Sequence, residues 1–376
     1  MEYRNLEKLS IKTSLLGFGC MRFPLKDGKI DRYLSKKMVD YAIKNGVNYI
    51  DTAYFYHNGE SELVVKEIIK DYDRESFYLA DKLPTWMIKE ESDVLRIFND
   101  QLDKTGVDYF DFYLIHAVNK TRLEEIKKYK VLEKLKQLKL QGKIRYIGFS
   151  FHDNLDVFKE AVNLFDWDFC QIQLNYMDTN HQQGLEGYDI LTNREIPVII
   201  MEPIKGGSLA KFNPEIEIMF NDYNPTASIS SWALRWVGSL PNVKVILSGM
   251  STMEHVIDNI QTFTNFKPLE KHELELIDSV KSKLISLTKV DCTDCKYCMP
   301  CEYGVNIPTN FKIYNQHAMY ENDKSAKWQL SNLEKSNQTS ENCVECQECV
   351  SKCPQNIDIP TKLKESEEYF KEYGLK

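Results

Sequence analysis

The chain has 376 residues, is 43% hydrophobic and carries a formal net charge of −8 at pH 7. This length is sufficient for one large domain or two, and the hydrophobic fraction is sufficient for a sizeable core. An acidic balance without a basic patch argues against a nucleic-acid partner, and no apolar run is long enough to cross a membrane.

Short apolar segments alternate with amphipathic segments from residue 14 to about residue 263. The expected strands are residues 15–21, 48–53, 77–83, 109–116, 144–150, 169–175, 197–203 and 243–249. Helical patterns fill the gaps, for example at residues 35–45, 60–72, 92–105 and 154–165, and the lysines and leucines of residues 127–143 also have helical spacing. Because strands that alternate with helices form parallel sheets, eight such units predict a closed (β/α)8 TIM barrel.

Four polar residues stand at or near the carboxyl ends of successive predicted strands. Asp51 ends the second strand and Tyr56 follows five residues later, while Lys82 and His116 end the third and fourth strands. Catalytic groups of (β/α)8 barrels gather at this end. Singly, each residue has a structural explanation, such as a helix cap for Asp51, but four in this order are more specific to catalysis.

Together these four side chains could protonate a carbonyl oxygen while a hydride reaches the carbonyl carbon. A tyrosine is a poor acid near neutral pH because its ordinary pKa is about 10. A neighbouring lysine ammonium stabilises the phenolate and lowers that pKa, so we expect Lys82 to act on Tyr56 in this way. A carboxylate can hold the lysine, and a histidine can orient the carbonyl oxygen.

Over roughly residues 1–265 the chain resembles the aldo-keto reductase family. Asp51, Tyr56, Lys82 and His116 match the tetrad of Asp, Tyr, Lys and His in that family. The resemblance implies a (β/α)8 barrel and NAD(P)H-dependent reduction of a small carbonyl compound, with Tyr56 as the acid. Phe55, Trp86, Phe151 and His152 are expected in or near loops at the barrel mouth, where aromatic side chains favour planar or apolar substrates or simply pack a loop.

The resemblance also implies a site for NADP or NAD. The residues expected to line it are Gly19, Cys20, Met21, Asp51, Ser150, Gln171, Met201, Gly206, Gly207, Ser248, Gly249, Ser251, His255 and Asn259. Two positions depart from the family: Phe151 replaces an asparagine, and Met201 replaces an aromatic residue that stacks on the nicotinamide. Ser251 and His255 lie where many members bind the 2′-phosphate with lysine and arginine, so NADH and NADPH are both alternatives.

Eight of the ten cysteines fall in two short runs near the C-terminus. The first run is Cys292, Cys295, Cys298 and Cys301, and the second is Cys343, Cys346, Cys349 and Cys353. This spacing is typical of two [4Fe–4S] clusters, in which three thiolates of one run share a cluster with the last thiolate of the other. We therefore expect Cys353 to complete the first cluster and Cys301 the second.

Zinc and disulfides are the competing explanations for these cysteines. Thiolates also bind zinc, but structural zinc sites usually take two ligand pairs held well apart, which fits four cysteines within ten residues poorly. Disulfides belong to oxidising compartments, and the first ten residues contain no signal-peptide core. Free cysteines with iron–sulfur clusters favour a reducing cytoplasm.

An internal repeat supports the cluster interpretation. Residues 301–309 resemble residues 353–361, with the same separation between cysteine and proline, as two half-sites related by a pseudo-twofold axis would have. The first copy departs from the pattern, because it has one residue fewer before Cys301 and has Glu302 where a proline is expected. Cys301 is therefore the least regular ligand.

The chain is thus expected to contain a barrel over residues 1–288 and a ferredoxin-like domain with two [4Fe–4S] motifs over residues 289–376. A helix at residues 271–287 should pack on the outside of the barrel. The spacer between the cysteine runs, residues 310–342, has a polar helical pattern, which favours a small α-helical ferredoxin-like module. The whole chain resembles oxidoreductases that join an aldo-keto reductase barrel to such a module.

Three functions are compatible with this organisation. The first is an enzyme that reduces a carbonyl or related unsaturated small molecule, with clusters that exchange electrons with a ferredoxin or another electron-transfer partner. The second is a redox-sensing or regulatory barrel with slow turnover, although a pure sensor needs no proton donor such as Tyr56. In the third, the clusters are catalytic and the nicotinamide site is vestigial.

Overall fold

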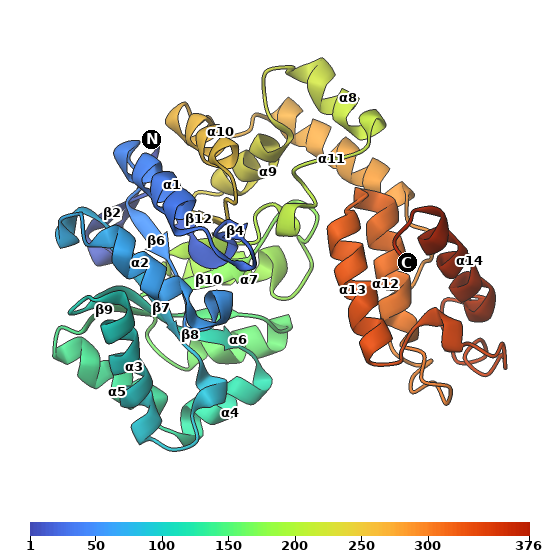
Figure 1. Ribbon diagram of the computed structural model, residues 1–376, viewed down its shortest axis with the longest axis horizontal. Coiled ribbons are helices and arrows are strands. Elements are labelled where there is room, and N and C mark those ends of the chain that lie inside the picture. The colour runs from blue at the N-terminus through green and yellow to red at the C-terminus, as the bar shows by residue number, and fades with distance from the viewer. The chain divides into compact units, whose positions relative to one another are not determined.

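The computed structural model describes residues 1–376, which divide by their internal contacts into two units (Figure 1). The first unit comprises Met1–Gly206 and Ser230–Glu270, and the second comprises Gly207–Ile229 and Lys271–Lys376. No helix in either unit is both long and apolar enough to cross a membrane.

Eight parallel strands close into a barrel in the first unit. Around the barrel they are β3 (Leu16–Gly19), β6 (Tyr49–Asp51), β7 (Tyr78–Leu83), β8 (Phe110–Val118), β9 (Ile144–Phe151), β10 (Phe169–Gln173), β11 (Val198–Met201) and β12 (Val243–Ser248). β12 pairs with β3, with Leu247 opposite Gly17, and this pairing closes the ring. The predicted (β/α)8 fold is confirmed, and each predicted strand overlaps one strand of the barrel.

Helices of the first unit follow the strands of the barrel (Figure 1). They are α1 (Arg32–Lys44), α2 (Ser61–Ile69), α3 (Ser92–Thr105), α4 (Lys120–Lys128), α5 (Val131–Leu140), α6 (Leu155–Asn163), α7 (Gly184–Asn193), α9 (Ile229–Gly238) and α10 (Met253–Thr264). In α3, Val94, Ile97 and Phe98 are buried at three- and four-residue spacing, and Gly106 ends the helix at a φ of 69°. The helical spacing of residues 127–143 corresponds to the end of α4 and to α5, and Lys130, with a left-handed φ of 50°, separates the two helices.

Aromatic and apolar side chains fill the barrel interior. The ring of Phe112 lies 4.9 Å from the rings of both Tyr49 and Phe169. Leu6 joins this cluster from the hairpin formed by β1 (Tyr3–Leu6) and β2 (Ile11–Ser14), which the sequence pattern did not predict. Because the interior is packed, ligand chemistry is confined to the carboxyl ends of the strands.

The second unit is helical. Its helices are α8 (Pro214–Tyr223), α11 (Lys271–Ser286), α12 (Ile307–Tyr320), α13 (Asp323–Lys335) and α14 (Ile359–Glu372). The predicted helical spacer, residues 310–342, contains most of α12 and all of α13. The predicted helix at residues 271–287 is α11, which belongs to the second unit and contacts α8 and α12. The boundary at residue 288 stays a prediction.

Candidate active site and cysteine-lined cavities

A buried lysine joins two neighbouring strands at their carboxyl ends. The Nζ atom of Lys82 lies 2.6 Å from Asp51 Oδ1 and 3.2 Å from Tyr56 Oη, and it donates to the carbonyl oxygen of Thr52 at 2.7 Å. Both ends of the ion pair are buried, with side-chain exposures of 0% for Lys82 and 3% for Asp51. Burial opposes the ammonium charge, but Asp51 and Tyr56 outweigh it and hold the pKa of Lys82 above its ordinary value.

A strained turn after β6 positions Tyr56. His57 and Asn58 both adopt left-handed conformations, with φ of 53° and 56°, which non-glycine residues adopt at a cost. Burial raises the pKa of Tyr56 to about 12, although the Lys82 ammonium acts in the opposite direction. The expected net lowering of this pKa is therefore wrong for the chain alone, and Tyr56 holds its proton at neutral pH.

His116 is the fourth residue of the predicted tetrad and lies near the end of β8. Burial, with a smaller contribution from Lys82, lowers the pKa of His116 well below its ordinary value, so the ring is neutral at pH 7. Its ring is edge-on to that of Tyr56 at 6.2 Å and lies 5.2 Å from the ring of Trp86, which stacks on Phe55 at 5.6 Å. The structure therefore brings the four predicted residues and two aromatic side chains together.

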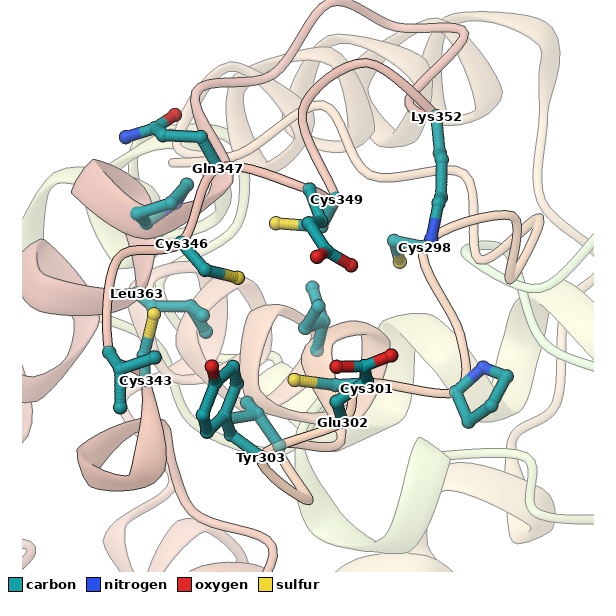
Figure 2. A pocket seen from close by; sticks show the side chains of 16 residues that line it. Cys298, Cys301, Glu302, Tyr303, Cys343, Cys346, Gln347, Cys349, Lys352 and Leu363 are labelled. Carbon is teal, nitrogen blue, oxygen red and sulfur yellow. The ribbon is translucent and has the colours of Figure 1, made fainter.

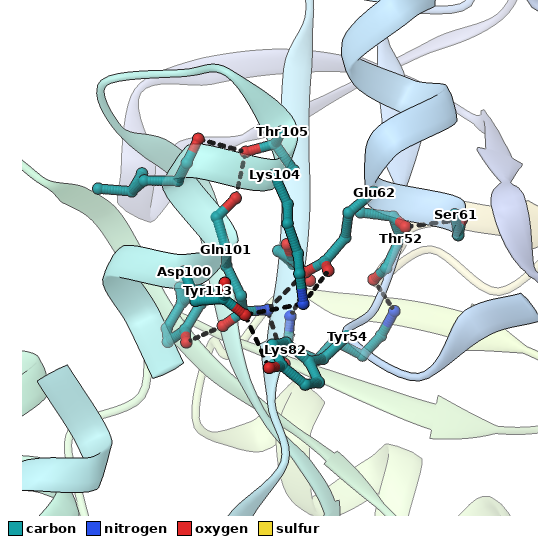
Figure 3. A network of polar contacts seen from close by, with 12 residues as sticks. Thr52, Tyr54, Ser61, Glu62, Lys82, Asp100, Gln101, Lys104, Thr105 and Tyr113 are labelled. Carbon is teal, nitrogen blue, oxygen red and sulfur yellow. Dashed lines mark hydrogen bonds and ion pairs between the residues drawn. The ribbon is translucent and has the colours of Figure 1, made fainter. Parts of the chain in front are cut away.

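A second polar network, which the sequence analysis missed, lies behind Lys82 (Figure 3). Asp81 and Glu62 are both fully buried, and the Oδ2 atom of Asp81 and the Oε2 atom of Glu62 have no hydrogen-bond partner. Gln101 donates to Glu62 Oε1 at 3.2 Å and to the carbonyl oxygen of Lys82 at 3.1 Å, and it accepts a hydrogen bond from Tyr113. Burial raises the pKa of both carboxyls, and the charge of Glu62 raises that of Asp81 further, so the pair favours a shared proton over two buried carboxylates.

This network anchors the backbone of Lys82 from the outer face of β7. Successive side chains of a strand point to opposite faces, so Asp81 must point away from the Lys82 side chain and toward the helices. That alternation was the available signal in the sequence. The other members of the network could not be predicted from this alternation, because Glu62 and Gln101 lie on the helices α2 and α3.

Three of the residues predicted to bind the nicotinamide lie on adjacent strands. Ser150 of β9 pairs with Gln171 of β10, and the Nε2 atom of Gln171 lies 3.4 Å from the sulfur of Met201 on β11. The Oγ atom of Ser150 accepts a hydrogen bond from the backbone of Ala117, which leaves its own proton free to donate. The Oε1 atom of Gln171 is buried without a hydrogen-bond partner.

The residues predicted at the adenosine end lie between β12 and α10. Asn259 donates to Ser248 Oγ at 2.8 Å, and the backbone N–H of Ser251 donates to a ring nitrogen of His255 at 3.4 Å. Ser251 Oγ also donates to the carbonyl oxygen of Arg22, a residue that the sequence analysis missed. Its only signal in the sequence was its position directly after the predicted residues Gly19, Cys20 and Met21.

Arg22 brings a cation to this end of the site. Its side chain lies so close to Gly249 that a Cβ atom on the glycine would fall 2.6 Å from Arg22 Cγ. In the loop after β11, Gly206 and Gly207 have φ of 62° and 100°, conformations that favour glycine.

The two cysteine runs surround two cavities in the second unit. The first-run cavity is lined by Cys292, Cys295, Cys298 and Cys353. The second-run cavity is lined by Cys301, Cys343, Cys346 and Cys349, whose sulfur atoms point into one space in Figure 2. Cys298 lines the second-run cavity as well, so the two cavities adjoin. These are the two sets of four that the spacing predicts.

The cavities suit a cluster better than a single ion. No group of three or more His, Cys, Asp or Glu side chains converges closely enough to hold one metal ion. Zinc would require such convergence, because its thiolate ligands lie about 2.3 Å from the metal. The second-run cavity instead encloses about 470 Å³ of empty space, part of it open to solvent.

The internal repeat is visible in the backbone of both runs. Asp294 and Lys296 have φ of 54° and 65°, and the equivalent residues Glu345 and Gln347 have φ of 55° and 66°. The proline that follows each run opens a helix in the same way. Asn306 caps α12 by accepting from the backbone of Thr309, and Asp358 caps α14 by accepting from that of Thr361.

Comparisons with known proteins agree with both units. Residues 15–282 match the aldo/keto reductase family, and residues 291–357 match the 4Fe-4S dicluster domain. The uncharacterized oxidoreductase YqkF of Bacillus subtilis (strain 168) is 24% identical over 310 residues, which cover 74% of this chain and 96% of YqkF. The NADH-specific methylglyoxal reductase of Escherichia coli (strain K12) is 24% identical over 302 residues, or 68% of this chain and 89% of that protein.

Among solved structures, an aldo-keto reductase from Klebsiella pneumoniae in complex with NADPH has a TM-score of 0.61 and 20% identity. The match covers 75% of this chain and 96% of that protein. At this identity the likeness concerns the barrel fold alone. The family match spans most of the barrel, and the cysteine runs lie within the second match. The chain therefore belongs to the aldo/keto reductase family and carries a C-terminal 4Fe-4S dicluster domain.

Proposed function

We propose that this oxidoreductase uses NAD(P)H to reduce a carbonyl or related unsaturated small molecule, with Tyr56 as the proton donor. One observation carries the proposal: the buried ammonium of Lys82 lies between the carboxylate of Asp51 and the hydroxyl of Tyr56. This arrangement suits a phenol that must release a proton and then be stabilised as a phenolate.

A bound nicotinamide would supply the hydride to the carbonyl carbon. Tyr56 gives its hydroxyl proton to the carbonyl oxygen, so the product is an alcohol. Lys82 stabilises the phenolate that Tyr56 becomes, and Asp51 keeps Lys82 charged. His116 is neutral and can donate one ring N–H to the carbonyl oxygen, which orients the substrate.

Several residues fit a nicotinamide cofactor. The unpartnered Oε1 atom of Gln171 and the free hydroxyl proton of Ser150 offer an acceptor and a donor for the carboxamide. Gly206 and Gly207 permit close approach of a pyrophosphate to the backbone. We further assign Asp51, Gly19, Cys20, Met21, Met201, Ser248, Gly249, Ser251, His255 and Asn259 to this site.

The choice between NADH and NADPH depends on the adenosine end. Arg22 lies beside Gly249 and Ser251 there and provides a cation that a phosphate could use. A similar structure contains NADPH, whereas a relative of similar identity is named NADH-specific. Anaerobic binding titrations with each cofactor distinguish the two.

We also propose that the second unit holds two [4Fe–4S] clusters, one in each cavity. Each cavity is lined by one predicted set of four thiols, three from one run and one from the other, as two-cluster ferredoxins require, and Cys298 of the first set also borders the second-run cavity. The clusters would exchange single electrons with a ferredoxin or another electron-transfer partner. A reducing compartment such as the cytoplasm suits these thiols.

The test uses the full-length protein, purified without oxygen. Oxidation of NADH and NADPH is followed against a panel of aldehydes and ketones, for the wild type and for Tyr56→Phe. The matched control is Tyr54→Phe, since the Tyr54 hydroxyl donates to Asp100, away from Lys82. Cofactor binding without turnover on any substrate would favour a regulatory barrel instead, and unchanged turnover in Tyr56→Phe would remove Tyr56 from the mechanism.

A further inference from the structure

The two cysteine runs form nearly equivalent scaffolds. In each run the first and third cysteines are partly exposed and the second is exposed, namely Cys295 in one run and Cys346 in the other. The left-handed residues between the cysteines agree within 1° in φ. Ligand type and solvent exposure, two of the factors that set cluster potentials, are therefore alike at the two sites, and the backbone that carries the ligands has the same conformation.

The charges that line the two cavities are not alike. Glu302, Glu348 and Lys352 line the second-run cavity, so two carboxylates face one ammonium and leave one net negative charge (Figure 2). Lys296 is the only charged side chain that lines the first-run cavity, which leaves one net positive charge. The cavities thus differ by two units of charge.

This difference arises where the internal repeat is broken. Lys296 in the first run corresponds to the neutral Gln347 in the second, and Glu348 in the second run corresponds to the uncharged Tyr297 in the first. The third break is Glu302, which stands after Cys301 where the other copy has a proline. Each of these three substitutions makes the second-run cavity more negative than the first-run cavity by one unit. Lys352, in the longer spacing before Cys353, offsets one of the three and leaves the difference of two units.

We propose that the two clusters have unequal reduction potentials, with the lower potential at the second-run cavity. This inference rests on the proposed pair of [4Fe–4S] clusters. Reduction adds one electron to a cluster and breaks or forms no covalent bond. Carboxylates near the cluster oppose that added negative charge and an ammonium favours it. At equilibrium a single electron in the module then resides mainly on the first-run cluster.

The test is an anaerobic redox titration of the full chain with dithionite, monitored by electron paramagnetic resonance. We expect two midpoints separated by more than a factor of ten in the one-electron equilibrium constant, which corresponds to about 59 mV. Glu302→Gln should raise the lower midpoint alone, and Lys296→Gln should lower the upper midpoint alone, so each variant narrows the gap. Glu334→Gln, at an exposed position of α13 and outside both cavities, is the control and should shift neither midpoint.

Iron and sulfide analysis of every variant separates the possible failures. Fewer than two clusters in the wild type would overturn the proposed function together with this inference. Two clusters with a common midpoint would overturn the inference alone, as would a Glu302→Gln variant that shifts the upper midpoint. Full iron content in both variants shows that a shift does not come from loss of the fold.

Discussion

The ammonium of Lys82 and the carboxylate of Asp51 form an ion pair of 2.6 Å whose members are almost completely buried. Such a pair is weak evidence for stability, because taking both charges out of water costs about as much as their attraction returns. Removing one partner is different, since the other charge is then buried without compensation. The pair therefore links the stability of the barrel to the chemistry of Tyr56.

Asp51→Asn should destabilise the protein by about 3–5 kcal/mol. It should also reduce carbonyl reduction, because Lys82 loses the carboxylate that keeps it charged. Urea unfolding and initial rates measure the two effects. The control is Asp71→Asn, which removes the partner of Lys36 in a surface pair and should change neither quantity appreciably. Equal stability of the two variants would show that the buried pair is not coupled to folding.

Tyr56→Phe should lower carbonyl reduction by about 10²- to 10⁴-fold, the range that a general acid contributes. The protein should remain folded and bind nicotinamide with little change, because only a hydroxyl is removed. Rates and binding titrations on the same preparation separate the two effects. A loss of cofactor binding equal to the loss of rate would assign Tyr56 to binding rather than to proton transfer.

The pH dependence follows from the raised pKa of Tyr56. Reduction needs the protonated phenol, and a pKa of about 12 keeps the proton in place throughout the neutral and mildly alkaline range. The rate of reduction should therefore show no alkaline loss assignable to Tyr56 in that range. Oxidation of the alcohol needs the phenolate and should rise with pH. Initial rates in both directions test this, and a reduction rate that falls near neutral pH while cofactor binding and the folded fraction stay constant would contradict it.

The fold was accessible from the sequence because each barrel unit repeats the same signals. Residues 92–105 were predicted as a helix and form α3, since their buried side chains recur with a helical period. The break at Lys130 gave no comparable signal, because a non-glycine residue in a left-handed conformation is not marked by composition. The hairpin of β1 and β2 was also missed, since only the tertiary structure buries Leu6.

The sequence predicted the site residues that lie at the carboxyl ends of neighbouring strands. It did not predict the residues that helices and loops bring to the site. Lys82 and Asp51 end neighbouring strands, so their meeting followed from the barrel. The direction of the pKa shift of Tyr56 could not be predicted in this way. The sequence pattern identifies Lys82 as a charged neighbour of Tyr56, but it does not show how deeply Tyr56 is buried. Glu62 and Arg22 were missed for the same reason, since helix packing and a loop bring them to their positions.

The Asp81–Glu62 pair predicts a pH-dependent term in stability. A carboxyl whose pKa is raised on folding holds its proton more tightly in the folded state than in the unfolded state. The carboxyl of Asp81 therefore contributes fully to the stability of the fold below its ordinary pKa of about 3.9. This contribution is lost as the pH rises through its raised pKa in the folded state. Asp81→Asn can donate to Glu62 without that proton, so its stability should fall less with rising pH.

Urea unfolding from acid to mildly alkaline pH measures this slope. Asp189→Asn, on the exposed side of α7, is the control and should keep the wild-type slope. Lys104 lies 3.9 Å from Glu62 and favours its ionised form, so Asp81 is the member of the pair to change first. Parallel slopes for wild type and Asp81→Asn would mean that the two carboxyls do not share a proton.

The cavities predict that the two cysteine runs exchange ligands. Cys353→Ser should damage the cluster held by Cys292, Cys295 and Cys298, although Cys353 belongs to the second run. Iron should fall from about eight to about four atoms per chain, and the surviving resonance signal should be that of the second-run cluster. Cys343→Ser is the matched change within the second run. It should remove the second-run cluster and leave the resonance signal of the first-run cluster. If both variants lost the same signal, each run would build its own cluster, and the pseudo-twofold exchange between the runs would be wrong.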